Sequence, residues 1–437
     1  MNKVFRKIIS LLMVSIILVG LCACGGDNST GTSGSNKVDE VRDLKGRTIR
    51  FLANWNEPTK GNSDFNNIYW AMKTKVEKEY NCKYEHVYLY DTTVYDTFIT
   101  SILSGNPMAD IICYKKNPFY AMKQGLFYDL KQLDEFDFTE DKWLKATSDI
   151  GTVNDKQYLM FSNKFVAVNL IFYNKDVFEQ YGQEDLWTLQ KAGKLTTEKF
   201  ISIATAISKA TGKNSMRVDI TADRLHNMFA FSKGISRVSR TPGTYDFKAT
   251  INTTEFVNAF KQAQKLIDTG VCSNGLDSSS WTYSREQFNS GNLPILMGSE
   301  DITGAFQNSN FNVGLCVMPT DDGKMTTMTS SLAWCAIPYN VENPGDVAFV
   351  WNKMTDVTFD VDYKIRYQDV VSDDAMDAIE ALSKLQTTEN IPVDYSFVAG
   401  VSDGGAINKM ITGAMTPAQA LQTIEPLYTN ALKGYKE

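Results

Sequence analysis

The amino terminus limits this chain more than any other segment. Three cations among the first seven residues precede an apolar run over residues 8–21, and the small residue Ala23 stands just before Cys24. A charged start, a short apolar core and a small residue before the cut are typical of a signal peptide. The apolar run is also shorter than the ~20 residues that a membrane-spanning helix needs. The sequence therefore predicts a protein that works outside the cytoplasm.

Cys24 is the predicted lipidation site. Leu21 at minus three and Ala23 at minus one resemble the lipobox of bacterial lipoproteins, whereas bulky Leu21 would stand directly before Cys22. Residues 1–23 are then the signal peptide, and more than one acyl chain on Cys24, palmitate included, would hold the protein stably at a membrane. An ordinary cleaved signal with an incidental cysteine is the alternative. We expect a lipid anchor on the extracytoplasmic face of a bacterial cell membrane, of the Gram-positive type.

Residues 24–40 form the predicted tether between the anchor and the folded part. They are rich in Gly, Ser, Thr and Asn and show no apolar periodicity, which is typical of a flexible linker. Roughly 395 residues follow, more than one hydrophobic core usually holds, so we expect two lobes. The net charge of −7, without any basic run, argues against nucleic acid and against an anionic membrane surface as partners.

The cysteines and histidines do not indicate a metal site or a disulfide framework. His86 and His226 lie far apart without neighbouring ligands, and the cysteines after the tether form no C-x-x-C pair. We expect these cysteines to be buried as small hydrophobic residues. They are Cys82, Cys113, Cys272, Cys316 and Cys335. The sequence thus predicts neither a metal nor a cofactor.

Strands and helices alternate along both halves of the chain. Residues 48–52 and 109–113 are predicted strands, and apolar residues recur at helical spacing between them. The second half repeats this theme, with helices that begin near Thr197, Asn252 and Thr416. This alternation favours an α/β arrangement in each lobe.

No catalytic motif stands out. The G-x-S-x-G, G-x-G-x-x-G and P-loop patterns are absent, and two histidines leave little for a hydrolase triad. A glycosidase needs two carboxylates at a defined separation, which a sequence does not show. An anchored extracellular carbohydrate-active enzyme and a structural surface lipoprotein therefore stay open beside a binding protein.

Five segments occur in an informative order. Residues 101–112 combine a helix, a glycine turn and Ala-Asp-Ile-Ile, and residues 124–130 contain Gly-Leu-Phe. Residues 168–178 contain Tyr-Asn-Lys-Asp-Val-Phe, residues 288–298 place two glycines around an apolar run, and residues 313–319 run from Val to Pro. Together they resemble the extracellular solute-binding proteins of ABC importers, in the sugar-binding family 1 that includes maltose-binding protein.

The resemblance implies a two-lobed, type II-like periplasmic-binding-protein fold, in which each lobe is a sheet flanked by helices and crossing hinge strands join the lobes. By analogy, one lobe comprises residues 41–151 and 334–385, and the other comprises 155–330 and 390–437. The implied function is non-enzymatic capture of a mono- or oligosaccharide in an interlobe cleft, with delivery to ABC permease subunits. We expect a monomer. A binding protein for a non-sugar polar ligand is an alternative.

A sugar site needs aromatic platforms beside hydrogen-bonding groups. Loops after the predicted strands contain this mixture, and Tyr114 and Asn117 stand where the maltose-binding relative places a stacking aromatic residue and a polar contact. The predicted ligand-binding residues are Trp55, Asn56, Tyr114, Asn117, Asp219, Arg224, Trp281, Tyr283, Glu300, Asp301 and Trp334.

Two of these predictions carry their own alternatives. Family members often have a tryptophan after the glycine that Gly298 matches, whereas this chain has Glu300 and Asp301 there, which weakens the disaccharide assignment and leaves a polar or partly cationic ligand as an alternative. Trp334 stands at the proposed crossover and could face the ligand or a packing cluster at the hinge. Trp55 and Trp281 could likewise be packing residues.

Overall fold

The computed structural model describes most of the chain after the tether. The described residues are 42–62, 64–89, 93–114, 117–140, 142–143, 145–160, 169–219, 223–275, 282–299, 306, 309–328, 333–356, 371–388, 393–402 and 404–435. The predicted signal peptide, Cys24 and tether lie outside them. Contacts group the elements that follow into one unit, Asp43–Glu437.

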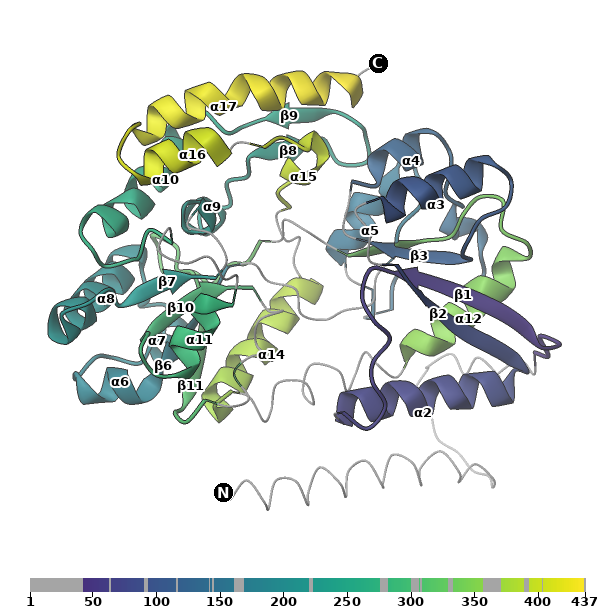
Figure 1. The fold of residues 1–437 in the computed structure, drawn as a ribbon, viewed down its shortest axis with the longest axis horizontal. Helices are drawn as coiled ribbons and strands as arrows, with labels where there is room; N and C mark the ends of the chain where they lie inside the picture. Colours follow the sequence, from purple (N-terminus) through teal and green to yellow (C-terminus); the bar gives the residue numbers. More distant parts are fainter. Residues whose placement is uncertain are drawn as a thin grey trace, which may run out of the picture. The chain divides into compact units, whose positions relative to one another are not determined.

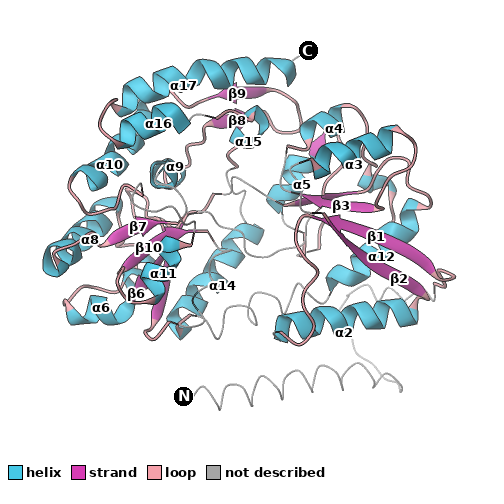
Figure 2. Ribbon diagram, in the orientation of Figure 1, coloured by secondary structure: helices cyan, strands magenta, loops and turns pink. Residues whose placement is uncertain are grey.

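The first sheet, sheet 1, has the strand order β12-β3-β1-β2. Figures 1 and 2 label β3, β1 and β2 of this sheet. The strands are β1 (Arg47–Ala53), β2 (Cys82–Tyr88), β3 (Ile111–Tyr114) and β12 (Trp334–Ala336). β1 is parallel to β2 and β3, whereas β12 pairs with β3 in the antiparallel sense. The two strands predicted from the sequence, 48–52 and 109–113, are thus confirmed as β1 and β3.

Alternate residues of β1 face opposite sides of sheet 1, as the strand period of two requires. Ile49 and Phe51 join α2 (Asp64–Glu79) and α12 (Pro344–Asp356) in one buried cluster. Leu52 belongs to another cluster with α3 (Val94–Leu103) and α4 (Phe119–Lys123). Helices therefore cover both faces of sheet 1.

Sheet 2 has the order β11-β6-β10-β7. Its strands are β6 (Leu170–Asn174), β7 (Met216–Val218), β10 (Ile295–Gly298) and β11 (Val313–Val317). β6 runs antiparallel to both β10 and β11, and β10 is parallel to β7. The helices connecting these strands are α6 (Lys175–Gln180), α7 (Leu186–Lys191), α8 (Thr197–Thr211), α9 (Asp223–Phe231), α10 (Thr254–Asp268) and α11 (Tyr283–Asn289).

Helix α14 (Asp373–Thr388) departs from the expected division of the chain. We expected residues 334–385 to belong with the first lobe, and β12 and α12 do pack there. The buried stripe of α14, which includes Ala375, Ile379 and Leu382, instead packs against sheet 2. Lys175 supports this placement, because its ammonium pairs with Asp374 in the first turn of α14. The part of this segment from residue 371 onward therefore belongs with the second sheet.

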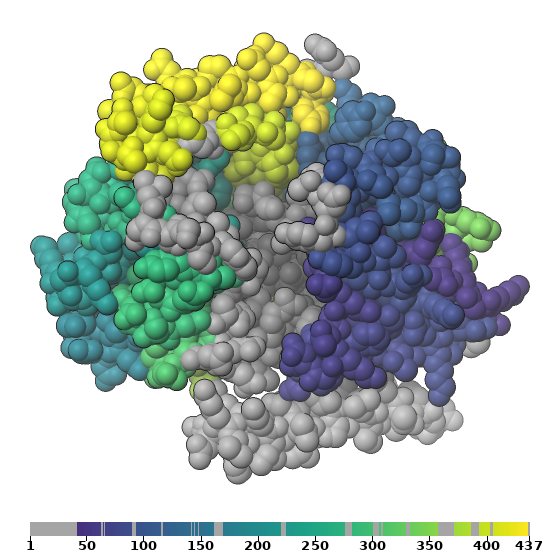
Figure 3. Space-filling view, in the orientation of Figure 1, coloured from purple at the N-terminus to yellow at the C-terminus, as the bar shows by residue number. Residues whose placement is uncertain are grey.

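The carboxyl-terminal helices pack over a small hairpin. The hairpin consists of β8 (Val238–Arg240) and β9 (Phe247–Ala249), and α15 (Ser396–Ala399), α16 (Gly404–Ile411) and α17 (Pro417–Leu432) follow near the end of the chain. Contacts join α17 to β9, α10 and α16. In Figure 3 these last helices form the yellow surface layer.

Two helix starts test the sequence reading. Thr416 is the N-cap of α17, as the predicted helix start near it requires, and it forms a capping box with Gln419, since each side chain accepts the other residue's backbone N–H. For α10, the sequence indicated a cap at Asn252, but the N-cap is Thr253, whose hydroxyl accepts the N–H of Phe256. The Asn252 prediction was therefore wrong by one residue.

The β8–β9 hairpin also contacts α4 and α5, two helices from the part of the chain that builds sheet 1. The guanidinium of Arg240 donates to the carbonyls of Asp149, Ile150 and Thr152, at 2.8–3.2 Å, at the end of α5 (Lys145–Gly151). Phe119 of α4 lies edge-on to Phe247, with ring centroids 4.9 Å apart. We call this contact between the hairpin, α4 and α5 the arginine clasp.

All five cysteines after the tether are buried and free, which confirms the prediction that they act as small hydrophobic residues. Their burial excludes water from the thiols, and for Cys272 it raises the pKa to about 12. Within the described residues, no helix combines the length and the apolar character needed to cross a bilayer.

Candidate functional site

Trp55 occupies the loop that follows β1. Because β1 and β3 are parallel, their carboxyl ends meet at one edge of sheet 1, where ligands of open α/β sheets bind. The Trp55 side chain is 36% exposed, and Phe51 packs edge-on against its ring at 6.4 Å. Its carbonyl accepts a hydrogen bond of 2.8 Å from Nε2 of His86. Asn56, the next predicted residue, is exposed.

Glu57 fixes this loop to helix α2, which sequence analysis did not anticipate. Its Oε1 accepts hydrogen bonds from the hydroxyl of Tyr69 at 2.8 Å and from Nζ of Lys73 at 2.7 Å. Trp70 adds a bond of 2.7 Å from its indole N–H to the Pro58 carbonyl. Burial and the Glu57 carboxylate raise the pKa of Tyr69, so its phenol stays protonated. The loop that carries Trp55 is thereby held in one conformation.

Tyr114 and Trp334 are buried between strands and helices. They face each other across β3 and β12, and both contact Tyr95. The Tyr114 ring stacks on Tyr95 at 5.9 Å, and the Trp334 ring lies edge-on to it at 6.0 Å. In this conformation Trp334 lies in the packing cluster that was its alternative placement. Ligand contact by either residue stays a prediction.

Asn117 ties the loop after β3 to the carboxyl-terminal elements. Its Oδ1 accepts the N–H of Phe119 at 3.0 Å. Its Nδ2 donates to the Val398 carbonyl at 3.2 Å and also bonds to the Tyr435 hydroxyl. The structure therefore gives Asn117 a positioning role, and its predicted ligand contact stays a prediction.

A second polar group lies at the carboxyl end of β7 in sheet 2. The Asp219 carboxylate is fully buried, and the guanidinium of Arg285 in α11 binds both its oxygens, at 2.9 and 2.8 Å. Such bidentate pairs are strong and directional. Arg285 was missed in the sequence, because nothing local marks a helical arginine whose partner is 66 residues away.

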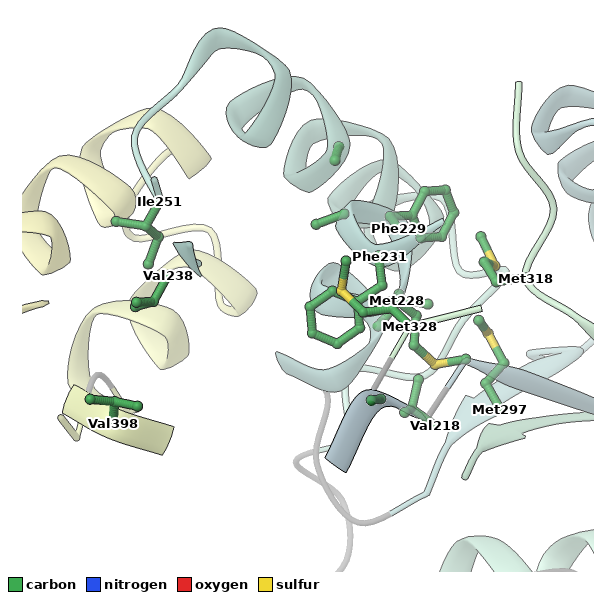
Figure 4. Packing of buried hydrophobic residues seen from close by; sticks show 14 of the residues in the cluster. Val218, Met228, Phe229, Phe231, Val238, Ile251, Met297, Met318, Met328 and Val398 are labelled. Carbon is green, nitrogen blue, oxygen red and sulfur yellow. The ribbon is translucent and has the colours of Figure 1, made fainter. Parts of the chain in front are cut away.

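Arg224 stands beside this pair at the start of α9. Its Nη1 lies 3.9 Å from Oδ2 of Asp219, which is too far for a hydrogen bond. In the described part of the chain this nitrogen is buried without a hydrogen-bond partner, although a third of the side chain is exposed. Behind it, Met228 and Phe229 of α9 pack with Val218 and Met297 of the sheet (Figure 4). Nη1 of Arg224 is thus a hydrogen-bond donor that has no acceptor within the described part of the chain.

Tyr283 is held by a neighbouring cation. The guanidinium carbon of Arg217 lies 4.7 Å from the centre of the Tyr283 ring, and Nε of Arg217 donates to the Ser284 hydroxyl at 3.1 Å. The remaining predicted residues on this side, Trp281, Glu300 and Asp301, lie outside the described residues.

The two groups offer contacts that a polar ligand with an apolar face could use. One group, around Trp55, offers a partly open aromatic ring, and the other, around Asp219, offers guanidinium donors. No group of three acidic, histidine or cysteine ligands that could hold a metal ion occurs among the residues described here. Both groups follow the carboxyl ends of strands, as the sequence predicted for Trp55, Asp219 and Arg224.

Residues 62–356 match the family model for bacterial extracellular solute-binding proteins. This range is more than half of the chain, so the chain belongs to that family of binding proteins and works outside the cytoplasm. No curated protein sequence matches the chain.

Solved structures of sugar-binding proteins share the fold. An ABC substrate-binding protein from Listeria monocytogenes in complex with cycloalternan is 16% identical with a TM-score of 0.62, covering 90% of this chain and 99% of that one. The galacto-N-biose/lacto-N-biose I-binding protein of Bifidobacterium longum, in complex with lacto-N-biose, is 14% identical with a TM-score of 0.64, covering 90% and 99%. The sugar-binding protein MalE from Xanthomonas citri is 12% identical with a TM-score of 0.65, covering 89% and 98%. The predicted fold, sheets flanked by helices as in solute-binding proteins, is confirmed.

Proposed function

We propose that this chain is a membrane-anchored receptor that captures a mono- or oligosaccharide and delivers it unaltered to the permease subunits of an ABC transporter. Family membership supports the role, and similar solved proteins are in complex with cycloalternan and lacto-N-biose. The sugar lies between the lobe built on sheet 1 and the lobe built on sheet 2. Acylated Cys24 anchors the protein on the extracytoplasmic face of a Gram-positive membrane.

The proposal depends on one observation: the partly exposed indole of Trp55 stands on a loop that Glu57 ties to α2. A sugar ring presents an apolar C–H face that stacks on an aromatic ring, while its hydroxyls need fixed donors and acceptors. Trp55 supplies the ring from sheet 1, and the guanidinium of Arg224, whose side chain is one-third exposed, supplies donors from sheet 2. Because Glu57 holds the Trp55 loop in place before the ligand arrives, less ordering entropy opposes binding.

Calorimetric titration with a panel of mono- and oligosaccharides, amino acids, peptides and polyamines tests the binding function. We expect tight binding of at least one sugar without product, and a loss of about tenfold or more, equal to ~1.4 kcal/mol, in Trp55→Ala. Tyr339→Ala is the matched control. This exposed aromatic residue follows β12, which is antiparallel to β3, so it lies near the amino end of β3, whereas Trp55 lies near the carboxyl ends of β1 and β3.

The outcomes separate the competing functions. Unchanged affinity in Trp55→Ala removes Trp55 from the site. Hydrolysed sugar in the mixture supports the extracellular enzyme, and binding only of a cationic or other polar solute supports the non-sugar receptor. No response to any solute supports a structural lipoprotein.

The anchor has a separate test. In Cys24→Ala the lipidation site is lost. We therefore expect no acyl chains by mass spectrometry and no acyl-mediated attachment to the membrane. Identical acylation of the variant would refute Cys24 as the lipidation site.

A further inference from the structure

Two of the buried cysteines lie directly opposite each other in sheet 1. Cys335 of β12 pairs with Cys113 of β3 in the antiparallel register. The N–H of Cys335 donates to the Met160 carbonyl at 2.7 Å, and its carbonyl accepts the N–H of Met160 at 2.9 Å. Both backbone groups of Cys335 therefore point away from β3, which makes Cys113 and Cys335 a non-hydrogen-bonded pair.

This kind of pair has the spacing that a disulfide needs. The Cα atoms of non-hydrogen-bonded antiparallel pairs are about 4.5 Å apart. Disulfides span Cα separations of roughly 4.4–6.8 Å. Neither strand would have to move far for the two sulfur atoms to join.

Both thiols also lie on the same face of the sheet. Cys113 is 1% and Cys335 0% exposed, and both belong to the buried cluster of Phe51 and Met160. Their strand neighbours Tyr114 and Trp334 belong to the cluster on the opposite face. Burial and the neighbouring thiol of Cys113 raise the pKa of Cys335.

The other cysteines lack such a partner in the strand pairing. Cys316 of β11 is opposite Ile171 of β6, and Cys82 of β2 is paired with Arg47 of β1. Cys272 forms an isolated bridge with Met216. They supply internal controls within the same chain.

We propose that Cys113 and Cys335 are joined by a cross-strand disulfide in the extracytoplasmic protein. Both thiols are free in the present structure. The oxidant is a small-molecule or protein disulfide, of the class of oxidised glutathione. One thiol, as its thiolate, attacks the oxidant and releases a first thiol, and the second thiol then displaces the remaining half. The pair loses two electrons and two protons, and the oxidant becomes two thiols.

Compartment and burial determine when this reaction occurs. Disulfides persist outside the cytoplasm, where this family works. In the folded chain, burial of Cys335 suppresses the thiolate that reacts. The bond therefore forms during folding, before β12 is fully covered. The bond would join two strands that are far apart in the sequence. A disulfide that closes a long loop removes more conformational entropy from the unfolded chain than one that closes a short loop, so this bond should stabilise the fold.

Thiol mapping tests the proposal on the full chain. The full chain is exported by its own signal in cells grown with oxidised glutathione in the medium. It is isolated from the membrane, unfolded with iodoacetamide and no reductant, and digested for mass spectrometry. We expect Cys113 and Cys335 in one linked peptide pair, and complete alkylation of Cys82, Cys272 and Cys316. Alkylation of both Cys113 and Cys335 overturns the proposal.

Thermal unfolding gives a second readout. Reductant should lower the melting temperature of the wild-type chain by at least about 4 °C and leave that of Cys335→Ala unchanged. Cys316→Ala is the control, and it should keep the reductant-sensitive shift. The absence of a shift in the wild-type chain, or an equal shift in Cys335→Ala, contradicts the bond. Sugar binding is not part of either measurement, so failure here and failure of the proposed function are distinguishable.

Discussion

Gly314 of β11 lies against a buried aromatic ring, so a single methyl group at this position should be costly. It pairs with Tyr173 of β6, and a Cβ at position 314 would lie 2.3 Å from Cζ of the Tyr173 ring. The ring has no free space to move into, because Tyr173 is fully buried. Its hydroxyl also donates to Asp185 at 2.8 Å and accepts the N–H of Trp187 at 3.2 Å.

The cost of Gly314→Ala follows from these contacts. Inserting a methyl group into a close-packed core costs about 1–3 kcal/mol. Displacing the Tyr173 ring also weakens a hydrogen bond to a carboxylate, a type worth roughly 1.5–3 kcal/mol. Because the ring moves only partly, we expect a total loss of about 2–4 kcal/mol in the free energy of unfolding.

Urea unfolding followed by far-ultraviolet circular dichroism measures this loss. Gly405→Ala in α16 is the matched control, since nothing lies within 4 Å of a Cβ there. That variant should be neutral or gain about 0.5–1 kcal/mol from helix propensity. In a Tyr173→Ala background, Gly314→Ala should cost much less. Wild-type stability of Gly314→Ala, with Tyr173 intact, would refute the close approach of these residues.

Three further substitutions probe the charged contacts. Arg285→Ala leaves the buried Asp219 carboxylate without its bidentate partner, so calorimetry should show a loss of about 3–5 kcal/mol. Asp185 should stabilise the fold fully above about pH 4, the ordinary pKa of an aspartate, and lose this contribution as the pH falls: burial raises its pKa, but hydrogen bonds and a nearby lysine lower it overall. The stability gap between wild type and Asp185→Asn should therefore shrink as the pH falls below this value, and a constant gap would contradict the assignment. Glu57→Ala should weaken sugar binding several-fold and shift the tryptophan emission without changing helix content, and this shift should be smaller in a Trp55→Phe background. Unchanged emission would show that Glu57 does not position the loop.

The elements of the fold could be predicted where neighbouring residues along the chain determine them. The strands at 48–52 and 109–113 and the helix start at Thr416 depend on apolar runs and caps that neighbouring residues supply. The placement of α14 could not, because its stripe of Ala375, Ile379 and Leu382 would suit either sheet. Only the tertiary contacts select sheet 2.

The candidate site, too, could be predicted from the sequence only in part. Trp55 follows a strand, and its exposure agrees with the position expected for a ligand platform. The burial of Tyr114 and Trp334 depends on Tyr95, which comes from a different segment and carries no recognisable motif. Glu57 and Arg285 were missed for a related reason, since their roles arise from pairings across the fold.

The arginine clasp restricts how the β8–β9 hairpin can move against α5. The buried Arg240 guanidinium donates to three carbonyls around the end of α5, and sliding the hairpin past that helix would leave these groups unpaired. A rotation of one half against the other that keeps these hydrogen bonds would leave the contact between Arg240 and α5 almost stationary. In such a rotation, the loops furthest from Arg240 would travel furthest.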